Sequence, residues 1–363
     1  MKQMERAEQQ KKRIRRKKRK KKSNLFKICV IILCVLAALL LVTAAAFLIL
    51  RAQGKRSLSE RENEAVITTV EEAESEENGK YVVYKGEKYC YNENVISILC
   101  MGIDTSISET GEDSIGENGQ ADALVLAVLD SETGELSLVN ISRDSMVDVN
   151  RFNVEGQFLG TEEMQICLAY AYGDGKEGSC LNTVESVSRL MYGMPIHAYA
   201  AIDYNGISVL NDAVGGVTVQ VLEDLTQKDP ELAEGNTVTL DGDQAHAYVR
   251  SRNTAILDSN NMRMARQKQY MLAFLQKALV QVRSNPASLL SLYQTAGDYM
   301  VTNVGFSEVT YLASLVMDTG ISEGAMYSVP GEVVQGDTYA EFIPDEQGLY
   351  ELILDVFYEK TDE

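Results

Sequence analysis

A run of 23 residues from Ile28 to Leu50 contains a single polar side chain, that of Thr43. As an α-helix rising about 1.5 Å per residue, this run would cross the roughly 30 Å hydrocarbon layer of a bilayer. Ala44-Ala45-Ala46 is a weak candidate for signal cleavage, but the run exceeds the roughly 7–15 apolar residues of a signal peptide. The sequence therefore predicts a retained transmembrane helix over residues 28–50.

The charges on either side of this run predict its direction. Residues 1–50 carry 14 Lys and Arg against 2 Glu, and most of the basic residues fall between Lys11 and Lys22. The positive-inside rule keeps such a segment in the cytoplasm, so we expect a cytoplasmic tail over 1–27 and an extracytoplasmic remainder. The basic run either serves orientation alone or also contacts anionic membrane lipid. A nucleic-acid partner is not expected beside a membrane span.

The exterior part of the chain is strongly acidic. Of 34 basic and 53 acidic residues in total, 20 and 51 fall after residue 50, a balance of −31. Residues 51–79 are polar and acidic and predict a stalk, followed by one domain over 80–363. Cys90, Cys100, Cys167 and Cys180 lie in this exterior part, where disulfides or buried free thiols are both open.

Hydrophobic patterns in the exterior part alternate between strand and helix. A small hairpin is expected over Lys85-Gly86, and a second over the turn sequence at 131–135. Strands are predicted at 95–103, 123–129, 136–141, 197–203, 217–222 and 245–250, and helices at 162–172, 181–191, 204–214, 261–282, 307–317 and 345–358. This order predicts a three-layer α/β/α sandwich with a mixed central sheet, preceded by the transmembrane helix.

The sequence lacks the residues that several common metal-binding and catalytic sites require. The chain has two histidines, neither near a second ligand at zinc spacing, and it contains no nucleophile elbow and no Walker lysine motif. The segment from Gly173 to Gly178 matches Gly-x-Gly-x-x-Gly. It follows a helical pattern instead of a strand, so it is interpreted as a loop and not as a dinucleotide site.

The arginines predict an anion site. Arg250 and Arg252, two residues apart, would share one face of an extended segment. Arg263, Arg266 and Gln267 would share one face at the start of a long helix. Five of the 20 exterior basic residues fall between Arg250 and Lys268, and Arg143 follows another predicted strand. Because arginine suits phosphate geometry and helix N-termini attract anions, we expect these groups to bind phosphate.

Two carboxylates are candidates for a matching cation. Asp104 ends the first core strand, and Asp122 begins the second. If these strands are antiparallel neighbours, both carboxylates lie at one sheet edge, where a hard ion such as Mg²⁺ could bridge them to phosphate oxygens. Taken alone, each aspartate is more often a turn or cap residue than a metal ligand.

Together these residues match a known pattern, whose members are spread along the exterior part. They are Gly102-Ile103-Asp104, Ala121-Asp122-Ala123, Ser142-Arg143-Asp144, the segments 168–173, 214–217 and 241–245, Tyr248-Val249-Arg250-Ser251-Arg252 and the helix start at 263–267. With the basic tail and the single anchor, this resembles the LytR-CpsA-Psr family over about residues 95–280. The resemblance implies a membrane-bound phosphotransferase that moves a cell-wall glycopolymer from a polyprenyl-pyrophosphate carrier to peptidoglycan.

By position, the resemblance assigns the Mg²⁺ carboxylates to Asp104 and Asp122. It assigns pyrophosphate binding to Arg143, Arg250, Arg252, Arg263, Arg266 and Gln267, with Arg143, Arg250 and Arg252 joining the two aspartates in catalysis, and it implies an apolar pocket for the prenyl chain. The family often has arginine where this chain has Gln120 and aspartate where it has Asn260, and the usual proline before Arg143 is Ser142. These departures keep two alternatives open: a binding or regulatory module for polyprenyl-pyrophosphate lipids, and a polyprenyl-pyrophosphate pyrophosphatase.

Overall fold

The computed structural model describes residues 38, 41–61, 73–107, 115–252, 259–321, 326–336 and 338–361. The chain divides into two compact units, 1–53 and 54–363. In the first unit, residues 41–53 are helical. The cytoplasmic tail and most of the predicted transmembrane segment lie outside the described residues. Within the described ranges, no helix combines the length and the apolar character needed to cross a bilayer.

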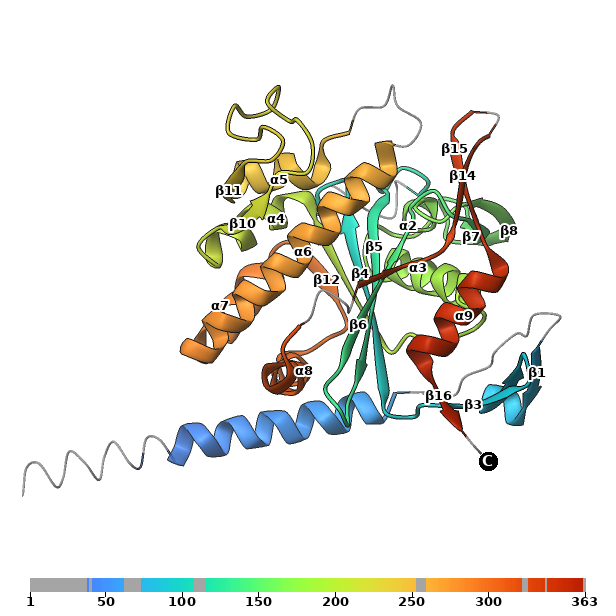
Figure 1. The fold of residues 1–363 in the computed structure, drawn as a ribbon, viewed down its shortest axis with the longest axis horizontal. Coiled ribbons are helices and arrows are strands. Elements are labelled where there is room, and N and C mark those ends of the chain that lie inside the picture. The colour runs from blue at the N-terminus through green and yellow to red at the C-terminus, as the bar shows by residue number, and fades with distance from the viewer. Residues whose placement is uncertain are drawn as a thin grey trace, which may run out of the picture. The chain divides into compact units, whose positions relative to one another are not determined.

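A central mixed sheet organises the second unit (Figure 1). The described part of this sheet has the order β12-β9-β4-β5-β6-β13. β4 pairs antiparallel with β5, and β5 with β6, whereas β4 and β9 are parallel, as are β6 and β13. The strands are β4 Val95–Ile103, β5 Ala121–Asp130, β6 Leu136–Ile141, β9 Ala198–Asp203, β12 Met300–Thr302 and β13 Met326–Ser328. The predicted mixed α/β fold with a central mixed sheet is confirmed, as is the hairpin over 131–135.

Both faces of this sheet are covered by helices, because alternate strand residues point to opposite sides and both sets are apolar. Leu99 and Leu126 belong to the core cluster that includes residues of α3 Glu177–Leu190 and α9 Glu346–Phe357. On the opposite face, Val125 packs with α6 Ser259–Ser284, and Ile96 packs with α8 Phe306–Thr319. In Figure 1, α6 crosses the sheet as one long rod.

Smaller elements surround these layers. A second core cluster joins α4 Tyr204–Ala213, the hairpin of β10 Val217–Gln220 and β11 Thr237–Leu240, α5 Gly242–Arg250 and α7 Ala287–Gly297 to α6. The remaining elements are the hairpin of β7 Met146–Phe152 and β8 Phe158–Gln165, the short helix α2 Leu168–Ala171, the sheet of β1 Ala73–Glu76, β2 Tyr81–Tyr84, β3 Glu87–Tyr91 and β16 Tyr358–Thr361, the 3₁₀ turn Glu77–Gly79, and the hairpin of β14 Gly331–Gln335 and β15 Ala340–Pro344.

One predicted strand is a helix. Residues 245–250 lie in α5, whose N-terminus carries a capping box. The Asp241 carboxylate accepts from the Gln244 amide at 2.8 Å, and the Gln244 side chain accepts from the Asp241 amide at 3.1 Å. Ala245, Tyr248 and Val249 are buried at helical spacing. Capping and one-sided burial therefore favour a helix here, and the prediction that Arg250 and Arg252 share a strand face was wrong.

One predicted helix is divided between the end of a strand and a short helix. Residues 158–165 form β8, paired with β7, and only the four residues of α2 are helical in the predicted range 162–172. Pairing with β7, the preceding strand, overrides helical propensity in β8. Most residues of β8 are exposed.

Parts of the predicted stalk are folded. Helical residues 54–59 pack on α8, where Leu58 is 2% exposed beside Ile96 and Tyr311. Farther along, β1 pairs with β2. The folded unit therefore includes described residues on both sides of 62–72.

Candidate functional site: an arginine–carboxylate cluster above an apolar cavity

One carboxylate joins two guanidinium groups at an end of the sheet. Asp122 is the second residue of β5, and its Oδ1 accepts from Arg143 Nη1 while its Oδ2 accepts from Arg263 Nη1 at 3.0 Å. The antiparallel register, which pairs Leu124 with Ile141, brings Arg143 beside Asp122 just beyond the end of β6. The structure therefore unites three of the predicted residues, supplied by β5, the turn after β6 and the start of α6.

Two amide side chains extend this cluster. The Gln120 side-chain oxygen accepts from Arg143 Nη2. Asn260 donates to Asp144 Oδ2 at 2.8 Å and accepts from Arg263 Nη2 at 2.9 Å. The two positions where the sequence departs from the family pattern are therefore built into the hydrogen-bonded cluster.

Asp104 stands at the same edge. Ile103 pairs with Ala121 in the antiparallel ladder, so Asp104 and Asp122 belong to neighbouring strand ends as predicted. Asp104 Oδ1 accepts from the Gln120 backbone amide at 2.7 Å, and the Asp104 amide donates to the Gln120 carbonyl at 3.1 Å. Gly119 has φ +85°, and a Cβ there would lie 2.6 Å from Thr105 Oγ1, so this close approach requires glycine.

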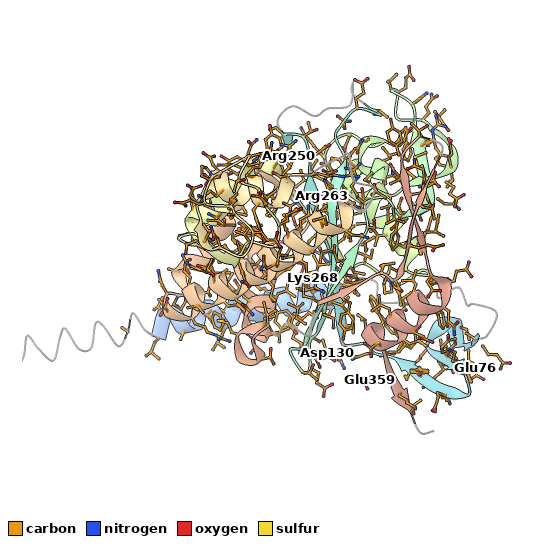
Figure 2. All side chains as sticks on the ribbon, turned by 45° about the horizontal axis from the view of Figure 1, so that its top comes forward. Glu76, Asp130, Arg250, Arg263, Lys268 and Glu359 are labelled. Carbon is orange, nitrogen blue, oxygen red and sulfur yellow. The ribbon has the colours of Figure 1, made fainter. Side chains whose placement is uncertain are left out.

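Arg250 and Arg252 approach from the end of α5. Arg250 Nη2 donates to the Asp104 carbonyl at 3.3 Å, and its guanidinium lies 4.7 Å from the Tyr204 ring centroid. Arg252 is near enough to lower the pKa of both Asp144 and Arg263 electrostatically. Figure 2 shows Arg250 and Arg263 close together in the upper part of the view, and Asp130, at the far end of β5, in the lower part.

Arg266 and Gln267 lie outside the hydrogen-bonded cluster and have other roles. Arg266 is 1% exposed, donates to the carbonyls of Tyr248 and Ser251, and lies 2.5 Å from Glu223. These bonds tie α6 to the end of α5, so the guanidinium is committed to the fold. Gln267 donates to the Val249 carbonyl at 3.1 Å and lines the cavity described below.

The cluster has buried positive charge with incomplete hydrogen bonding. Within the described part of the chain, the buried Nε of Arg263 has no hydrogen-bond acceptor, and the buried Nε of Arg143 has only an ion-pair contact with Asp144 Oδ1 at 3.5 Å. Burial, together with repulsion from Arg143 and Arg252, lowers the pKa of Arg263 to about 10. Burial raises the pKa of Asp144 against the opposing field of the arginines. An anion placed here would relieve this repulsion and meet donors that lack acceptors.

An apolar cavity of about 260 Å³ opens beside the cluster. It lies between the sheet and helices α4 and α6, and its lining includes Cys100, Gly102, Ala123, Ile202, Gln267 and Phe274. Because Gln267 lines the cavity and lies one helical turn after Arg263 on α6, the cavity adjoins the charged cluster. The structure thus contains an apolar pocket of the kind that the family resemblance implied.

The two aspartates fit a magnesium ion in donor type. Mg²⁺ is commonly held by one or two carboxylates, with substrate phosphates and water completing its shell, and Asp104 and Asp122 supply such carboxylates at one sheet edge. No group of three or more His, Cys, Asp or Glu side chains in the described ranges could hold a metal by itself. Asp122 would have to share its oxygens between the ion and two arginines.

Three further side chains at the site had no place in the predicted set. Asp144, at 4% exposure, closes the link from Asn260 to Arg143. Cys167 Sγ lies 3.1 Å from Arg143 Nη2, and burial raises the pKa of this thiol to about 11. Tyr204 supports Arg250. Of these three residues, only Asp144 could have been identified from the sequence, because it is adjacent to Arg143. Cys90, Cys100, Cys167 and Cys180 are free thiols.

The fold and site define a mixed α/β protein with an arginine-rich anion site beside an apolar cavity. The chain belongs to the LytR_cpsA_psr family, whose model matches residues 57–353. The resemblance inferred from the motifs is therefore confirmed.

Two curated relatives and one solved structure place the chain more closely. It is 29% identical over 225 residues to the polyisoprenyl-teichoic acid–peptidoglycan teichoic acid transferase TagU of Enterococcus faecalis, covering 61% of this chain and 66% of that protein. It is 26% identical over 268 residues to biofilm regulatory protein A of Streptococcus mutans, covering 71% and 63%. The crystal structure of Bacillus subtilis TagV superposes with a TM-score of 0.58 at 25% identity, covering 72% of this chain and 96% of that one. The chain thus matches less than two thirds of the length of either curated relative.

Proposed function

We propose that this protein transfers a cell-wall glycopolymer from a polyprenyl-pyrophosphate carrier to peptidoglycan. The observation that carries the proposal is the junction of Arg143 and Arg263 on Asp122 beside the apolar cavity. A lipid pyrophosphate is an anion with a long apolar chain, and this site offers both kinds of surface. The name of the E. faecalis relative, a polyisoprenyl-teichoic acid–peptidoglycan transferase, supports the same chemistry.

The substrate is placed by charge and polarity. The pyrophosphate lies among Arg143, Arg250, Arg252 and Arg263, whose guanidinium groups donate to its phosphate oxygens. The first prenyl units enter the cavity past Gln267. Arg266 acts indirectly, by holding the end of α5 and therefore Arg250 in position.

Transfer is a substitution at the sugar-linked phosphorus. A hydroxyl oxygen of the acceptor glycan forms the new P–O bond, the bond to the bridging oxygen breaks, and the lipid leaves as its monophosphate. The hydroxyl proton is released to water as the new bond forms, and the departing lipid phosphate takes the electron pair of the broken bond. Arginines fixed before reaction stabilise the charge that develops on the phosphoryl oxygens. Mg²⁺ held by Asp104 and Asp122 would supply further neutralisation of that charge when bound.

The same proposal fixes where the reaction occurs. Residues 28–50 anchor the chain in the cell membrane as a single span, with residues 1–27 in the cytoplasm and the acidic domain outside. The anchor keeps the site near a substrate whose own lipid remains in the bilayer.

A second candidate is a module that binds the lipid pyrophosphate without transfer. It is favoured by Gln120, which places an uncharged amide on Arg143 where the family often has another arginine. The S. mutans relative named as a biofilm regulatory protein is consistent with such a role. A third candidate function for the same site is a pyrophosphatase, with water as the acceptor.

The deciding experiment uses the full-length protein in lipid nanodiscs with a polyprenyl-pyrophosphate-linked glycopolymer, peptidoglycan and Mg²⁺. Polymer bound covalently to peptidoglycan supports the transferase, binding without turnover supports the module, and phosphate release without transfer supports the pyrophosphatase. Arg143→Ala should abolish product formation. Arg283→Ala, twenty residues farther along α6 than Arg263 and about 30 Å away, is the matched control.

A further inference from the structure

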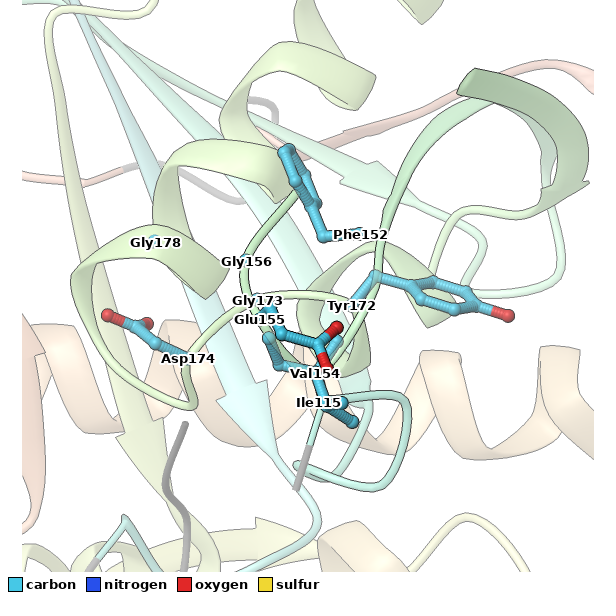
Figure 3. Close-up of a pocket in the computed structure, with 9 residues that line it drawn as sticks. All are labelled: Ile115, Phe152, Val154, Glu155, Gly156, Tyr172, Gly173, Asp174 and Gly178. Carbon is cyan, nitrogen blue, oxygen red and sulfur yellow. The ribbon is translucent and has the colours of Figure 1, made fainter. Parts of the chain in front are cut away.

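A second pocket is lined in part by Ile115, which begins the described segment that leads into the charged cluster (Figure 3). Its volume is about 460 Å³, within the range of about 300–1,000 Å³ that is usual for small-ligand sites. The walls are the turn between β7 and β8, the connection between α2 and α3, and the loop at Ile115. The Gly173–Gly178 segment, whose sequence indicates a loop, forms one of these walls.

The lining suits an uncharged, hydroxyl-rich ring. Phe152 and Tyr172 provide aromatic surface, and Glu155 and Asp174 provide carboxylate acceptors; in Figure 3, Asp174 and Tyr172 lie on opposite sides of Glu155. No basic side chain is among the described lining residues. This composition opposes phosphate or carboxylate ligands and favours a sugar, which stacks its apolar face on aromatic rings and donates hydroxyl hydrogens to carboxylates.

The pocket walls are held in place. Asp174 Oδ1 accepts from the backbone amides of Lys176 and Ser179 at 2.8 and 3.1 Å, which fixes this carboxylate at the start of α3. The Arg151 guanidinium lies 5.7 Å from the Tyr172 ring centroid and pairs with Glu162, so it holds the ring from outside the lining. A preorganised wall of this kind lowers the entropic cost of binding.

The same walls lead directly to the charged cluster. The Gly116 amide donates to the Ala171 carbonyl at 2.7 Å, and the buried Asn118 side chain donates to the Gly173 carbonyl at 2.8 Å. Two residues later, Gln120 contacts both Arg143 and Asp104. Ile115 is five residues from Gln120, so the pocket begins within about 17 Å of the cluster along the chain. This distance corresponds to the length of a few sugar rings.

We infer that this pocket is a saccharide subsite that holds an uncharged pyranose unit a few rings away from the reacting phosphorus. The inference rests on the proposed function, since a glycan must reach the cluster for the subsite to have a purpose. The ring could belong to the peptidoglycan acceptor or to the glycan of the lipid-linked donor. The chemistry of recognition is the same for both sources.

The test measures direct binding by the full-length protein in nanodiscs, without turnover. The acceptor arm uses tetra-N-acetylchitotetraose, and the donor arm compares farnesyl pyrophosphate with farnesyl pyrophosphate that carries N-acetylglucosamine. The variants are Tyr172→Ala, Glu155→Gln and Asp174→Asn, the last of which keeps the Oδ1 acceptor that caps α3. Tyr339→Ala is the matched control, because Tyr339 is 71% exposed in the turn between β14 and β15.

Tyr172→Ala should weaken chitotetraose binding at least about tenfold if the acceptor occupies the pocket, or weaken only the sugar-bearing donor if the donor glycan does. Tyr172→Phe should retain binding because it keeps the aromatic ring, and unchanged farnesyl pyrophosphate binding by Tyr172→Ala shows that this variant is folded. The inference is overturned if neither sugar binds, or if both bind the pocket variants as well as wild type. Farnesyl pyrophosphate without sugar tests the proposed function separately, since Arg143→Ala should weaken it while Tyr172→Ala should not.

Discussion

Asn260 donates its side-chain amide to Asp144 Oδ2 across 2.8 Å, at a buried point where the first turn of α6 meets the end of β6. The same side chain accepts from Arg263. An amide can donate to one charged neighbour and accept from the other at the same time, whereas an ionised carboxylate can only accept. Asn260 therefore joins a buried anion to a buried cation with both of its polar atoms.

Asn260→Ala should destabilise the folded domain by about 1–3 kcal/mol, because it leaves Asp144 and Arg263 each short of a buried partner. Urea denaturation followed by circular dichroism measures the loss. Asn285→Ala, on the exposed stretch between α6 and α7, should change stability by less than about 0.5 kcal/mol. Equal denaturation midpoints for the two variants would show that the buried amide is not a structural link.

Gln120→Arg should tighten anion binding and weaken the ligand-free fold. A guanidinium at this position would face Arg143, whose Nη2 now donates to the Gln120 oxygen. Repulsion between the two cations should cost about 1 kcal/mol without ligand, and a bound pyrophosphate should more than compensate it.

Calorimetric titration of farnesyl pyrophosphate at several salt concentrations measures the Gln120→Arg effect. The variant should bind more tightly at low salt and show a steeper loss with salt than wild type. Gln227→Arg, on an exposed loop, adds the same charge elsewhere and should leave the affinity nearly unchanged. A variant that binds no more tightly than wild type would contradict a pyrophosphate site around Arg143.

The sheet and part of the site could be predicted because their signals are local. Alternating apolar residues and the turn at 131–135 fix the pairing of neighbouring strands, and this pairing brings Asp104 and Asp122 to one edge. A strand is predicted at residues 245–250 because small, polar and branched side chains alternate there. Asp241 and Gln244 nevertheless have the sequence of a capping box, which indicates a helix start.

The sequence could not predict which arginines would join the anion site and which would hold the fold together. Arg263 and Arg266 are three residues apart on α6, and both are buried, yet one pairs with Asp122 and the other with the carbonyls that end α5. Helical spacing places both on one face without saying which neighbours that face meets. That outcome depends on where α5 and the β5 end lie in the tertiary fold.

Leu58→Ala should destabilise the folded unit by about 2–4 kcal/mol, because it opens a cavity where residues 54–59 pack on α8. Gly54 lies so close that a Cβ would be 2.1 Å from the Ser307 carbonyl oxygen, and Ser57 and Arg61 both donate to the buried Glu308. Urea denaturation of the full-length protein gives the loss. Leu181→Ala, at a residue 50% exposed on α3, should have little effect. Equal stability of both variants would mean that the segment before residue 62 is not part of the cooperative fold.

His197 should make the fold sensitive to acid. Its side chain is 7% exposed, and Nδ1 accepts from the Ser97 amide at 2.9 Å, so protonation of this atom would break a buried hydrogen bond. Burial and the nearby Arg61 lower its pKa from 6.5 to about 4. The neutral form is therefore favoured in the folded state, and the stability it contributes is complete above pH 6.5 and is lost as the pH falls toward 4.

Between pH 7.5 and 4.5, this group should account for a loss on the order of 2 kcal/mol, measured as the difference in stability between wild type and His197→Asn. Asparagine can accept from the Ser97 amide without titrating, so its stability profile should be flatter over this range. His246→Asn is the matched control, because the chain has two histidines and His246 is only partly buried, beside Arg250, Tyr204 and Asp243. If His197→Asn and wild type lose stability in parallel on acidification, then His197 does not stay neutral in the folded protein.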